Sequence, residues 1–172
     1  MMSEADPLTL VLVGPMAAGK TSIGRRVARR LEVPFIDTDK RIAREHGPIP
    51  AIFEEHGEAH FRQLERAAVA AALEEGGVIS LGGGAVTDAG TRELLRPYPV
   101  AFLTVSPEAV ADRIRGGGRP LLAGDDPLER WTRIFEERRG WYDEVATMVF
   151  DTSRRPMQRI ADEIVTWRRE QR

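Results

Sequence analysis

Residues 14–21, Gly-Pro-Met-Ala-Ala-Gly-Lys-Thr, are of the types that bind a chain of phosphates. They match the pattern G-x-x-x-x-G-K-[ST], in which backbone N–H groups turn toward phosphate oxygens. Lys20 supplies a compact positive charge, and the Thr21 hydroxyl can ligate Mg²⁺. The alternative is a glycine turn without function, but one of only two lysines among 25 basic residues lies here. The pattern predicts nucleoside triphosphate binding and leaves the acceptor open.

Two aspartates follow the apolar segment 33–36, which is predicted to be a strand. The carboxyl ends of parallel strands face the ligand crevice, so we expect Asp37 and Asp39 near the phosphates. One carboxylate can orient the shell of a Mg²⁺ ion while the other receives the proton of an acceptor hydroxyl. The alternative for Asp39 is that it only caps the N-terminus of the next helix.

Glycine and arginine recur at the other places where a ligand is expected. Gly82–Gly84 end a third predicted strand, which allows the backbone to approach a ligand closely unless the run is a plain turn. Residues 115–126 combine hinge glycines with Arg119 and predict a lid that closes on the transferring phosphoryl group, the alternative being a loop without a role. Taken alone, Arg62 is expected at the surface, and Arg138 complements a helix C-terminus.

The pattern of apolar residues predicts alternating strands and helices. Continuous apolar runs predict buried parallel strands at 8–13, 33–36, 78–81, 100–105 and 148–150. Helical spacing predicts helices at 22–31, 40–74 with breaks near Gly47 and Gly57, 88–95, 107–114, 127–142 and 156–169. This alternation favours one α/β domain over residues 1–172, with a parallel sheet between two layers of helices.

Composition narrows the class of protein. The net charge of -2 and the 6% aromatic content argue against a nucleic-acid partner. No apolar run approaches the roughly 20 residues that span a bilayer, and residues 1–7 do not resemble a signal peptide. The chain has no cysteine, which excludes disulfides and thiolate sites. We therefore expect a cytoplasmic monomer that acts on small molecules and has no membrane partner.

Taken together, these motifs resemble the shikimate kinase family over nearly the whole chain. The matching stretches are 14–22, Asp37-Thr38-Asp39, Phe61-Arg62, 81–86, 119–122, Arg138 with Tyr142 four residues later, and 151–156. Several separated motifs in the right order are far more specific than a phosphate loop alone. The resemblance implies a three-layer α/β/α fold like that of nucleoside monophosphate kinases, with a five-stranded parallel sheet, substrate-binding helices over about 38–74 and a mobile lid.

The same resemblance implies the reaction and the residue roles. It implies ATP-dependent phosphorylation of the shikimate 3-hydroxyl, in the pathway to chorismate, with Mg²⁺ as cofactor and Lys20, Asp39 and Arg119 as catalytic residues. The nucleotide would be bound by Gly14, Ala17, Ala18, Gly19, Lys20, Thr21, Ser22, Arg119 and Arg155. Shikimate would be bound by Asp39, Arg62, Gly82, Gly83, Gly84 and Arg138, and the metal by Thr21 and Asp37.

The resemblance is not complete, and rival functions stay open. Ala17 stands where the family often has a third loop glycine. The sequence does not decide whether Arg113 or Arg115 stacks on adenine. Rival functions are a kinase of the same fold for gluconate, for another small hydroxy acid or for a nucleoside monophosphate, and a nucleotide-binding module that has lost catalysis. The pairing of Arg62 with Arg138 favours shikimate, because two guanidinium groups suit capture of one carboxylate.

Overall fold

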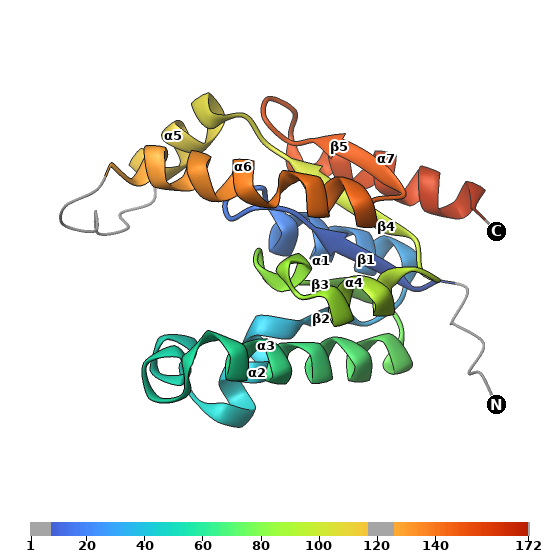
Figure 1. Ribbon diagram of the computed structural model, residues 1–172. Helices are drawn as coiled ribbons and strands as arrows, with labels where there is room; N and C mark the ends of the chain where they lie inside the picture. Colours follow the sequence, from blue (N-terminus) through green and yellow to red (C-terminus); the bar gives the residue numbers. More distant parts are fainter. Residues whose placement is uncertain (1–7, 117–125, 172) are drawn as a thin grey trace.

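The computed structural model describes residues 8–116 and 126–171, without the side chains of residues 115 and 116 (Figure 1). Its centre is a sheet of five parallel strands in the order β2-β3-β1-β4-β5. The strands are β1 (Leu10–Val13), β2 (Phe35–Asp37), β3 (Val78–Ser80), β4 (Val100–Thr104) and β5 (Met148–Asp151). The predicted fold class and all five predicted strands are confirmed.

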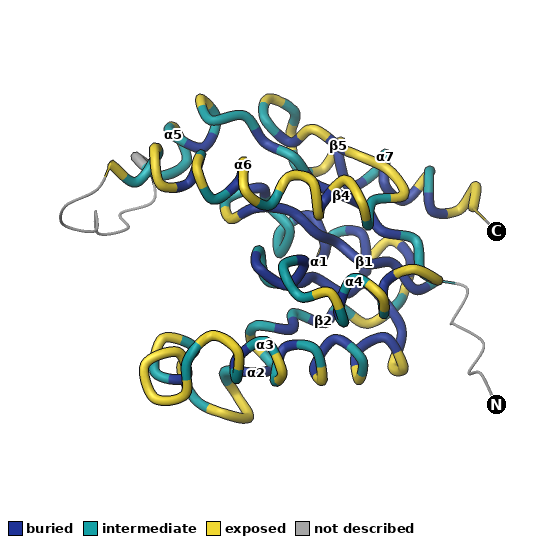
Figure 2. The backbone as a smooth tube through the Cα atoms, viewed as in Figure 1, coloured by how far each residue is buried: buried dark blue, intermediate teal, exposed yellow. Residues whose placement is uncertain are grey.

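In the described part of the chain, seven α-helices and one short 3₁₀ helix, η1, lie between or after the strands. They are α1 (Lys20–Leu31), α2 (Thr38–His46), α3 (Ile49–Glu75), η1 (Ala85–Thr87), α4 (Ala89–Leu95), α5 (Pro107–Gly116), α6 (Pro127–Val145) and α7 (Met157–Glu170). α1 and α7 pack against each other on one face of the sheet, and α4 and α6 pack together on the other (Figure 1). Burial on both faces explains why β1, β3 and most of β4 are dark blue in Figure 2.

α1 forms directly from its sequence pattern. Ile23, Val27 and Leu31 recur at helical spacing and are at most 6% exposed, so they pack against the sheet. Gly24 shares this face, where a Cβ would lie 2.6 Å from the Phe35 ring. Small size at this position lets α1 lie close to β2. The helix therefore begins immediately behind the phosphate loop and is fixed by the core.

α2 and α3 form an arm with a small core of its own. Ile42, Ile52, Phe61 and Ala68 make a hydrophobic cluster separate from the main one. Gly57, at φ 81°, breaks the helical path inside α3 at one of the predicted breaks. The outward side of this arm is largely exposed in Figure 2. The arm thus carries one wall of a cleft without belonging to the central sheet.

Parallel pairing brings the carboxyl ends of all five strands to one edge of the sheet. The loop after β1, the start of α2 after β2 and the glycine run after β3 therefore meet there, as the sequence predicts. Within the described residues, no helix is long and apolar enough to cross a membrane.

Candidate active site

The phosphate loop lies between β1 and α1, and its glycines are sterically required. Gly14 has φ 150°, and a Cβ there would collide with the Leu103 carbonyl oxygen. Gly19, at φ 89°, is the N-cap of α1 and also lies in a region that favours glycine. Ala17 has φ 67°, a left-handed conformation that is unusual for a residue with a Cβ. The turn expected of a third loop glycine is thus present with alanine in its place.

Side-chain donors bind the carbonyl oxygen of every residue from 14 to 18. Lys20 Nζ donates to the carbonyls of residues 14 and 15 at 2.7 and 2.9 Å. Trp131 Nε1 donates to Met16 at 2.8 Å, and Thr152 Oγ1 to Ala18 at 2.8 Å.

The guanidinium of Arg113 completes this set by donating to the carbonyl of Ala17 and to that of Thr152. It therefore holds the strained residue of the loop in place. The loop conformation is fixed by the protein itself, through donors from α1, α5, α6 and the segment after β5.

Thr21 and Asp37 face each other at the edge where a metal is expected. Thr21 Oγ1 lies 3.5 Å from Asp37 Oδ2. Asp37 Oδ1 accepts a hydrogen bond from the Lys40 backbone N–H at 3.1 Å, so Asp37 is the N-cap of α2. The alternative that Asp39 caps this helix is therefore wrong; Asp39 lies in the first turn, and its side chain is available for another role.

The donor set at this edge fits Mg²⁺. In the described part of the chain, no group of three His, Cys, Asp or Glu side chains could hold a metal ion. Mg²⁺ is usually held by one or two protein oxygens together with phosphate oxygens and water. One hydroxyl and one carboxylate beside a phosphate loop match that pattern.

The glycine run after β3 lies among the predicted substrate ligands. A Cβ at Gly82 would lie 2.5 Å from Asp39 Oδ1, and one at Gly84 would collide with the Arg62 guanidinium. A Cβ at Gly83 would lie 3.7 Å from Arg138 Nη1 and 3.6 Å from the carbonyl oxygen of Gly14 in the phosphate loop. Side chains from α2, α3 and α6 thus converge on one backbone segment that has no side chains of its own.

Arg62 is held in the crevice by carboxylates and is not a solvated surface residue. Its side chain is 13% exposed, with Nη1 2.8 Å from Glu65 Oε1 and Nη2 3.3 Å from Glu58 Oε1. Glu65 is 1% exposed, and burial raises its pKa to about 7 although Arg62 opposes the shift. Glu65 was not predicted from the sequence as a site residue; its position one helical turn after Arg62 is the signal that identifies it.

Three buried polar atoms in this region have no hydrogen-bond partner. They are Asp39 Oδ1, Arg62 Nε and Glu65 Oε2. The only other such side-chain atom among the described residues is Thr9 Oγ1, immediately before β1. Unsatisfied buried atoms destabilise a fold and are rare. Their concentration here indicates a surface that is completed by a polar ligand.

Charges across the crevice are close enough to shift one another's pKa. Burial lowers the pKa of Lys20 to about 8; Asp39 and Asp37 oppose this shift, and Arg138 adds to it. Burial and the neighbouring Asp37 raise the pKa of Asp39, while Lys20 and Arg62 act in the opposite direction. The lysine of the phosphate loop and the groups of the acceptor side thus share one electrostatic environment.

The other residues predicted to bind the nucleotide lie in the loop, in α1 and after β5, or outside the described residues. Ala18 is fully buried in the loop, and the Ser22 hydroxyl accepts a hydrogen bond from Arg26. Arg155 forms an ion pair with Glu163 and donates to the Asp151 carbonyl at 3.2 Å. Arg119 and most of the predicted lid, and also the Arg115 side chain, lie outside the described residues.

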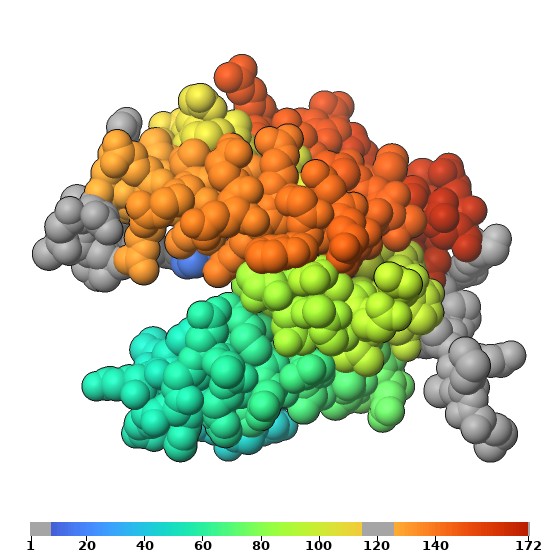
Figure 3. Space-filling view, viewed as in Figure 1, coloured from blue at the N-terminus to red at the C-terminus, as the bar shows by residue number. Residues whose placement is uncertain are grey.

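Tyr142 is a further residue that supports the site. The residue is 1% exposed, and its hydroxyl donates a hydrogen bond to the carbonyl of Gly83. This bond fixes the glycine run against α6, the helix that also carries Arg138. Figure 3 shows the resulting cleft between the teal surface of α2 and α3 and the orange surface of α6, with blue atoms of the N-terminal segment inside it.

Comparison with known proteins agrees with this geometry. The family model described as shikimate kinase matches residues 16–169. The shikimate kinase of Corynebacterium efficiens is 44% identical over 158 residues, which cover 91% of this chain and 94% of that protein. The solved structure of shikimate kinase from Acinetobacter baumannii in complex with shikimate matches with a TM-score of 0.84 at 34% identity, covering 96% of this chain and 95% of that one.

A gluconokinase from Sinorhizobium meliloti is similar in fold alone. Its structure matches with a TM-score of 0.66 at 21% identity, covering 96% of this chain and 93% of that one. The shikimate kinase model, in contrast, spans most of the chain, and the relative from Corynebacterium efficiens shares more than two fifths of the aligned residues. This chain belongs to the shikimate kinase family.

Proposed function

We propose that this crevice transfers the γ-phosphoryl group of ATP to the 3-hydroxyl of shikimate and releases ADP and shikimate 3-phosphate. Membership of the family fixes the reaction class, a phosphotransfer from ATP to an alcohol. One observation carries the assignment of residues. Asp39, Arg62 and Arg138 meet around Gly82–Gly84, which lie directly beside the phosphate loop.

Residues of the first wall bind the nucleotide. The phosphate loop presents its N–H groups and Lys20 to the phosphates. In the free protein Lys20 donates hydrogen bonds to two loop carbonyls, and bound phosphate oxygens would accept hydrogen bonds from it instead. Thr21 and Asp37 would hold Mg²⁺, which supplies charge neutralisation at the phosphate oxygens when bound. Arg119 would approach from the lid, and Arg155 would lie near the adenine.

Residues of the second wall bind the acceptor. The Arg62 and Arg138 guanidinium groups suit bidentate binding of the substrate carboxylate. Because Glu65 and Glu58 already orient Arg62, little side-chain freedom is lost when the substrate binds. Asp39 Oδ1, buried and without a partner, is placed to accept a hydrogen bond from a ring hydroxyl.

Asp39 is also the group that can receive the proton of the attacking hydroxyl. As the oxygen–phosphorus bond to the acceptor forms, the bond from the γ-phosphorus to the bridging oxygen breaks, and ADP leaves with that electron pair. The raised pKa of Asp39 makes it a stronger proton acceptor than an exposed aspartate. Its carboxylate thus aligns the hydroxyl and then carries its proton.

Other features of the proposal concern the protein as a whole. We propose that the chain is a single domain whose sheet and phosphate loop bind ATP, whose helices over about 38–74 bind shikimate, and whose segment 115–126 closes as a lid. We also propose that it acts as a monomer in the cytoplasm. The net charge of -2 argues against a nucleic-acid partner, and no apolar run of the sequence approaches the roughly 20 residues that span a bilayer.

The test is an acceptor comparison with the purified protein. ADP release from Mg-ATP is followed with shikimate, gluconate or a nucleoside monophosphate as acceptor, and the product is identified by ³¹P NMR. We expect ADP release with shikimate alone and one new phosphate monoester signal. Equal turnover with gluconate would overturn the acceptor assignment, and ATP binding without acceptor-dependent ADP release would indicate a module that has lost catalysis.

A further inference from the structure

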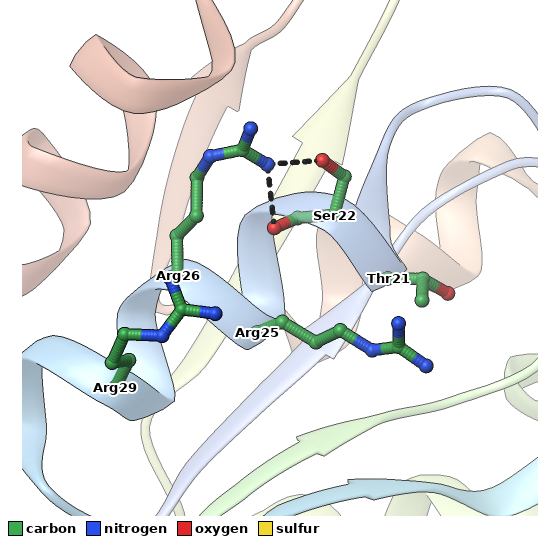
Figure 4. Close-up of a pocket in the computed structure, with 5 residues that line it drawn as sticks. All are labelled: Thr21, Ser22, Arg25, Arg26 and Arg29. Atoms are coloured by element: carbon green, nitrogen blue, oxygen red, sulfur yellow. Dashed lines mark hydrogen bonds between the residues drawn. The ribbon is translucent and has the colours of Figure 1, made fainter.

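A second basic site lies on the flank of α1, outside the crevice. It is a hollow of about 430 Å³ lined by Thr21, Ser22, Arg25, Arg26 and Arg29 (Figure 4). Thr21, Arg25 and Arg29 are four residues apart in succession, so they form one row along the helix. Only Thr21 and Ser22 are shared with the nucleotide half of the crevice. The three arginines have no role in the proposed reaction.

The arginines of this hollow are not neutralised by the protein. No carboxylate lines the hollow, and no ion pair of the described residues includes Arg25, Arg26 or Arg29. By contrast, the next arginine on the same helix, Arg30, pairs with Asp162. Like charges one turn apart repel each other on a helix. Three positive charges are therefore clustered at this place, although the net charge of the chain is -2.

Two of the guanidinium groups are nevertheless oriented. Arg26 Nη1 donates to the Ser22 hydroxyl and, at 3.1 Å, to the Ser22 carbonyl. The Arg25 guanidinium lies 5.8 Å from the centre of the Phe35 ring, and Figure 4 shows its side chain extending toward Thr21. The hollow thus offers guanidinium nitrogens and hydroxyl groups, both of which can donate hydrogen bonds to phosphate oxygens.

The positive surface continues beyond this hollow. A neighbouring hollow of about 230 Å³ shares Arg25 and is lined in addition by Lys40, Arg41 and Arg44, with Asp37 as its single carboxylate. Glu75 neutralises Arg41. Lys40 and Arg44 take part in no ion pair of the described residues. The field of this surface attracts anions toward the α1 flank.

We propose that the α1 hollow, lined by residues 21, 22, 25, 26 and 29, is a second anion site that binds the diphosphate group of a small oligophosphate. Three guanidinium groups match the several negative charges of a diphosphate, and two hydroxyls line the same hollow. The site adjoins the phosphate loop and shares Thr21 with it, but its main donors are arginine side chains of α1 and not loop N–H groups.

Inorganic pyrophosphate, without Mg²⁺, is the probe for this site. Isothermal titration of the wild-type protein is expected to show two binding events, one at the phosphate loop and one at the hollow. Lys20→Ala removes the charge of the loop and leaves the second event. In the Lys20→Ala background, Arg25→Gln with Arg29→Gln is expected to weaken the remaining event by at least about tenfold, because two charge-assisted contacts are lost.

The control variant carries the same change of charge elsewhere. Arg96→Gln with Arg130→Gln, at two exposed positions outside the hollow, is introduced into the same Lys20→Ala background and is expected to leave the affinity unchanged. Circular dichroism checks that each variant is folded. If the double variant at residues 25 and 29 is unstable, Arg29→Gln alone, at an exposed position, is expected to give a smaller loss in the same direction.

Two results would overturn the proposal. One is a Lys20→Ala protein that no longer binds pyrophosphate at all, which would assign every event to the phosphate loop. The other is equal affinity for pyrophosphate in the arginine variant and in its control, which would mean that net charge alone, and not the hollow, determines the affinity. Neither result bears on shikimate phosphorylation, which the acceptor comparison tests separately.

Discussion

Asp39, Arg62 and Glu65 form what we call the acceptor wall. The phosphate loop and this acceptor wall differ in how completely their polar atoms are hydrogen-bonded within the protein. In the loop, the carbonyls of residues 14–18 each accept a hydrogen bond from a side chain. In the acceptor wall, each of the three side chains keeps one buried atom without a partner.

The two halves of the crevice therefore bind their ligands in different ways. The loop is preorganised, so little freedom is lost when a nucleotide binds. The acceptor wall keeps buried polar atoms that destabilise the free protein and that a polar ligand can satisfy. Substitutions in the acceptor wall should therefore change chemistry and substrate binding most, whereas substitutions around the loop should have smaller effects that are confined to the nucleotide.

The largest effect is expected from Asp39→Asn. An amide cannot receive the proton of the attacking hydroxyl, so kcat should fall by about 10²- to 10⁴-fold. The KM for ATP should change little, because Asp39 is placed on the acceptor side. Steady-state assays with both substrates varied measure this change. A variant with near-normal kcat would remove Asp39 from the chemistry.

The next effect is expected from Arg62→Ala. Loss of two charge-assisted contacts to the substrate carboxylate should raise the KM for shikimate by about two orders of magnitude. The matched control is Arg66→Ala, one turn further along α3, where the side chain is 42% exposed and lies 3.7 Å from Asp88. An unchanged KM for shikimate in the Arg62 variant, or an equal increase in the control, would contradict the assignment.

The burial of Glu65 in the acceptor wall should be measurable as a pH dependence of the free energy of unfolding. Its pKa is about 7 in the folded protein against 4.5 ordinarily, so the native state binds more protons than the unfolded chain between these values. Stability should therefore fall as pH rises through this window, by about 2 to 3 kcal/mol between pH 5 and pH 7.5. Glu65→Gln removes this dependence. Urea unfolding of both proteins at pH 5 and pH 7.5 measures the difference, and parallel pH profiles would refute the burial argument.

Much of the fold, and the convergence of several candidate site residues, could be predicted from the sequence. Continuous apolar runs such as residues 10–13 indicate strands covered on both faces, and the motif around Lys20 indicates a site for the phosphates of a nucleoside triphosphate. The ends of parallel strands then bring Asp37 and Gly82–Gly84 together by topology alone. Local pattern and topology suffice for these features because each depends on short stretches of chain.

The supports of the site could not be predicted in the same way. Trp131 and Met16 are 115 residues apart in the chain and meet only after folding. Nothing in the sequence indicates which carbonyl oxygen an indole N–H will reach. The N-cap of α2 could not be predicted either, because the sequence offered Asp39 as a possible cap and the backbone geometry gives this position to Asp37. Arg62 resembled a surface residue until burial of Glu65 was known.

A smaller effect is expected from the pKa of Lys20. Phosphates favour charged Lys20 and so raise its pKa above the value of about 8 in the free protein. Near pH 8.5, ADP binding should take up part of a proton, and affinity should fall as pH rises through 8. Titration calorimetry in two buffers with different ionisation enthalpies measures this uptake. Lys20→Arg stays charged and should show none; equal uptake in both proteins would assign the proton to another group.

The smallest effect is expected where one bond to the loop is removed. Trp131→Phe keeps an aromatic ring beside Phe135 and removes the 2.8 Å hydrogen bond to the carbonyl of Met16. Loss of one neutral hydrogen bond should raise the KM for ATP by roughly two- to tenfold. The KM for shikimate should stay constant, because the acceptor wall is untouched. An equal rise in both constants would mean that Trp131 supports the whole crevice, and the two walls would then not be independent.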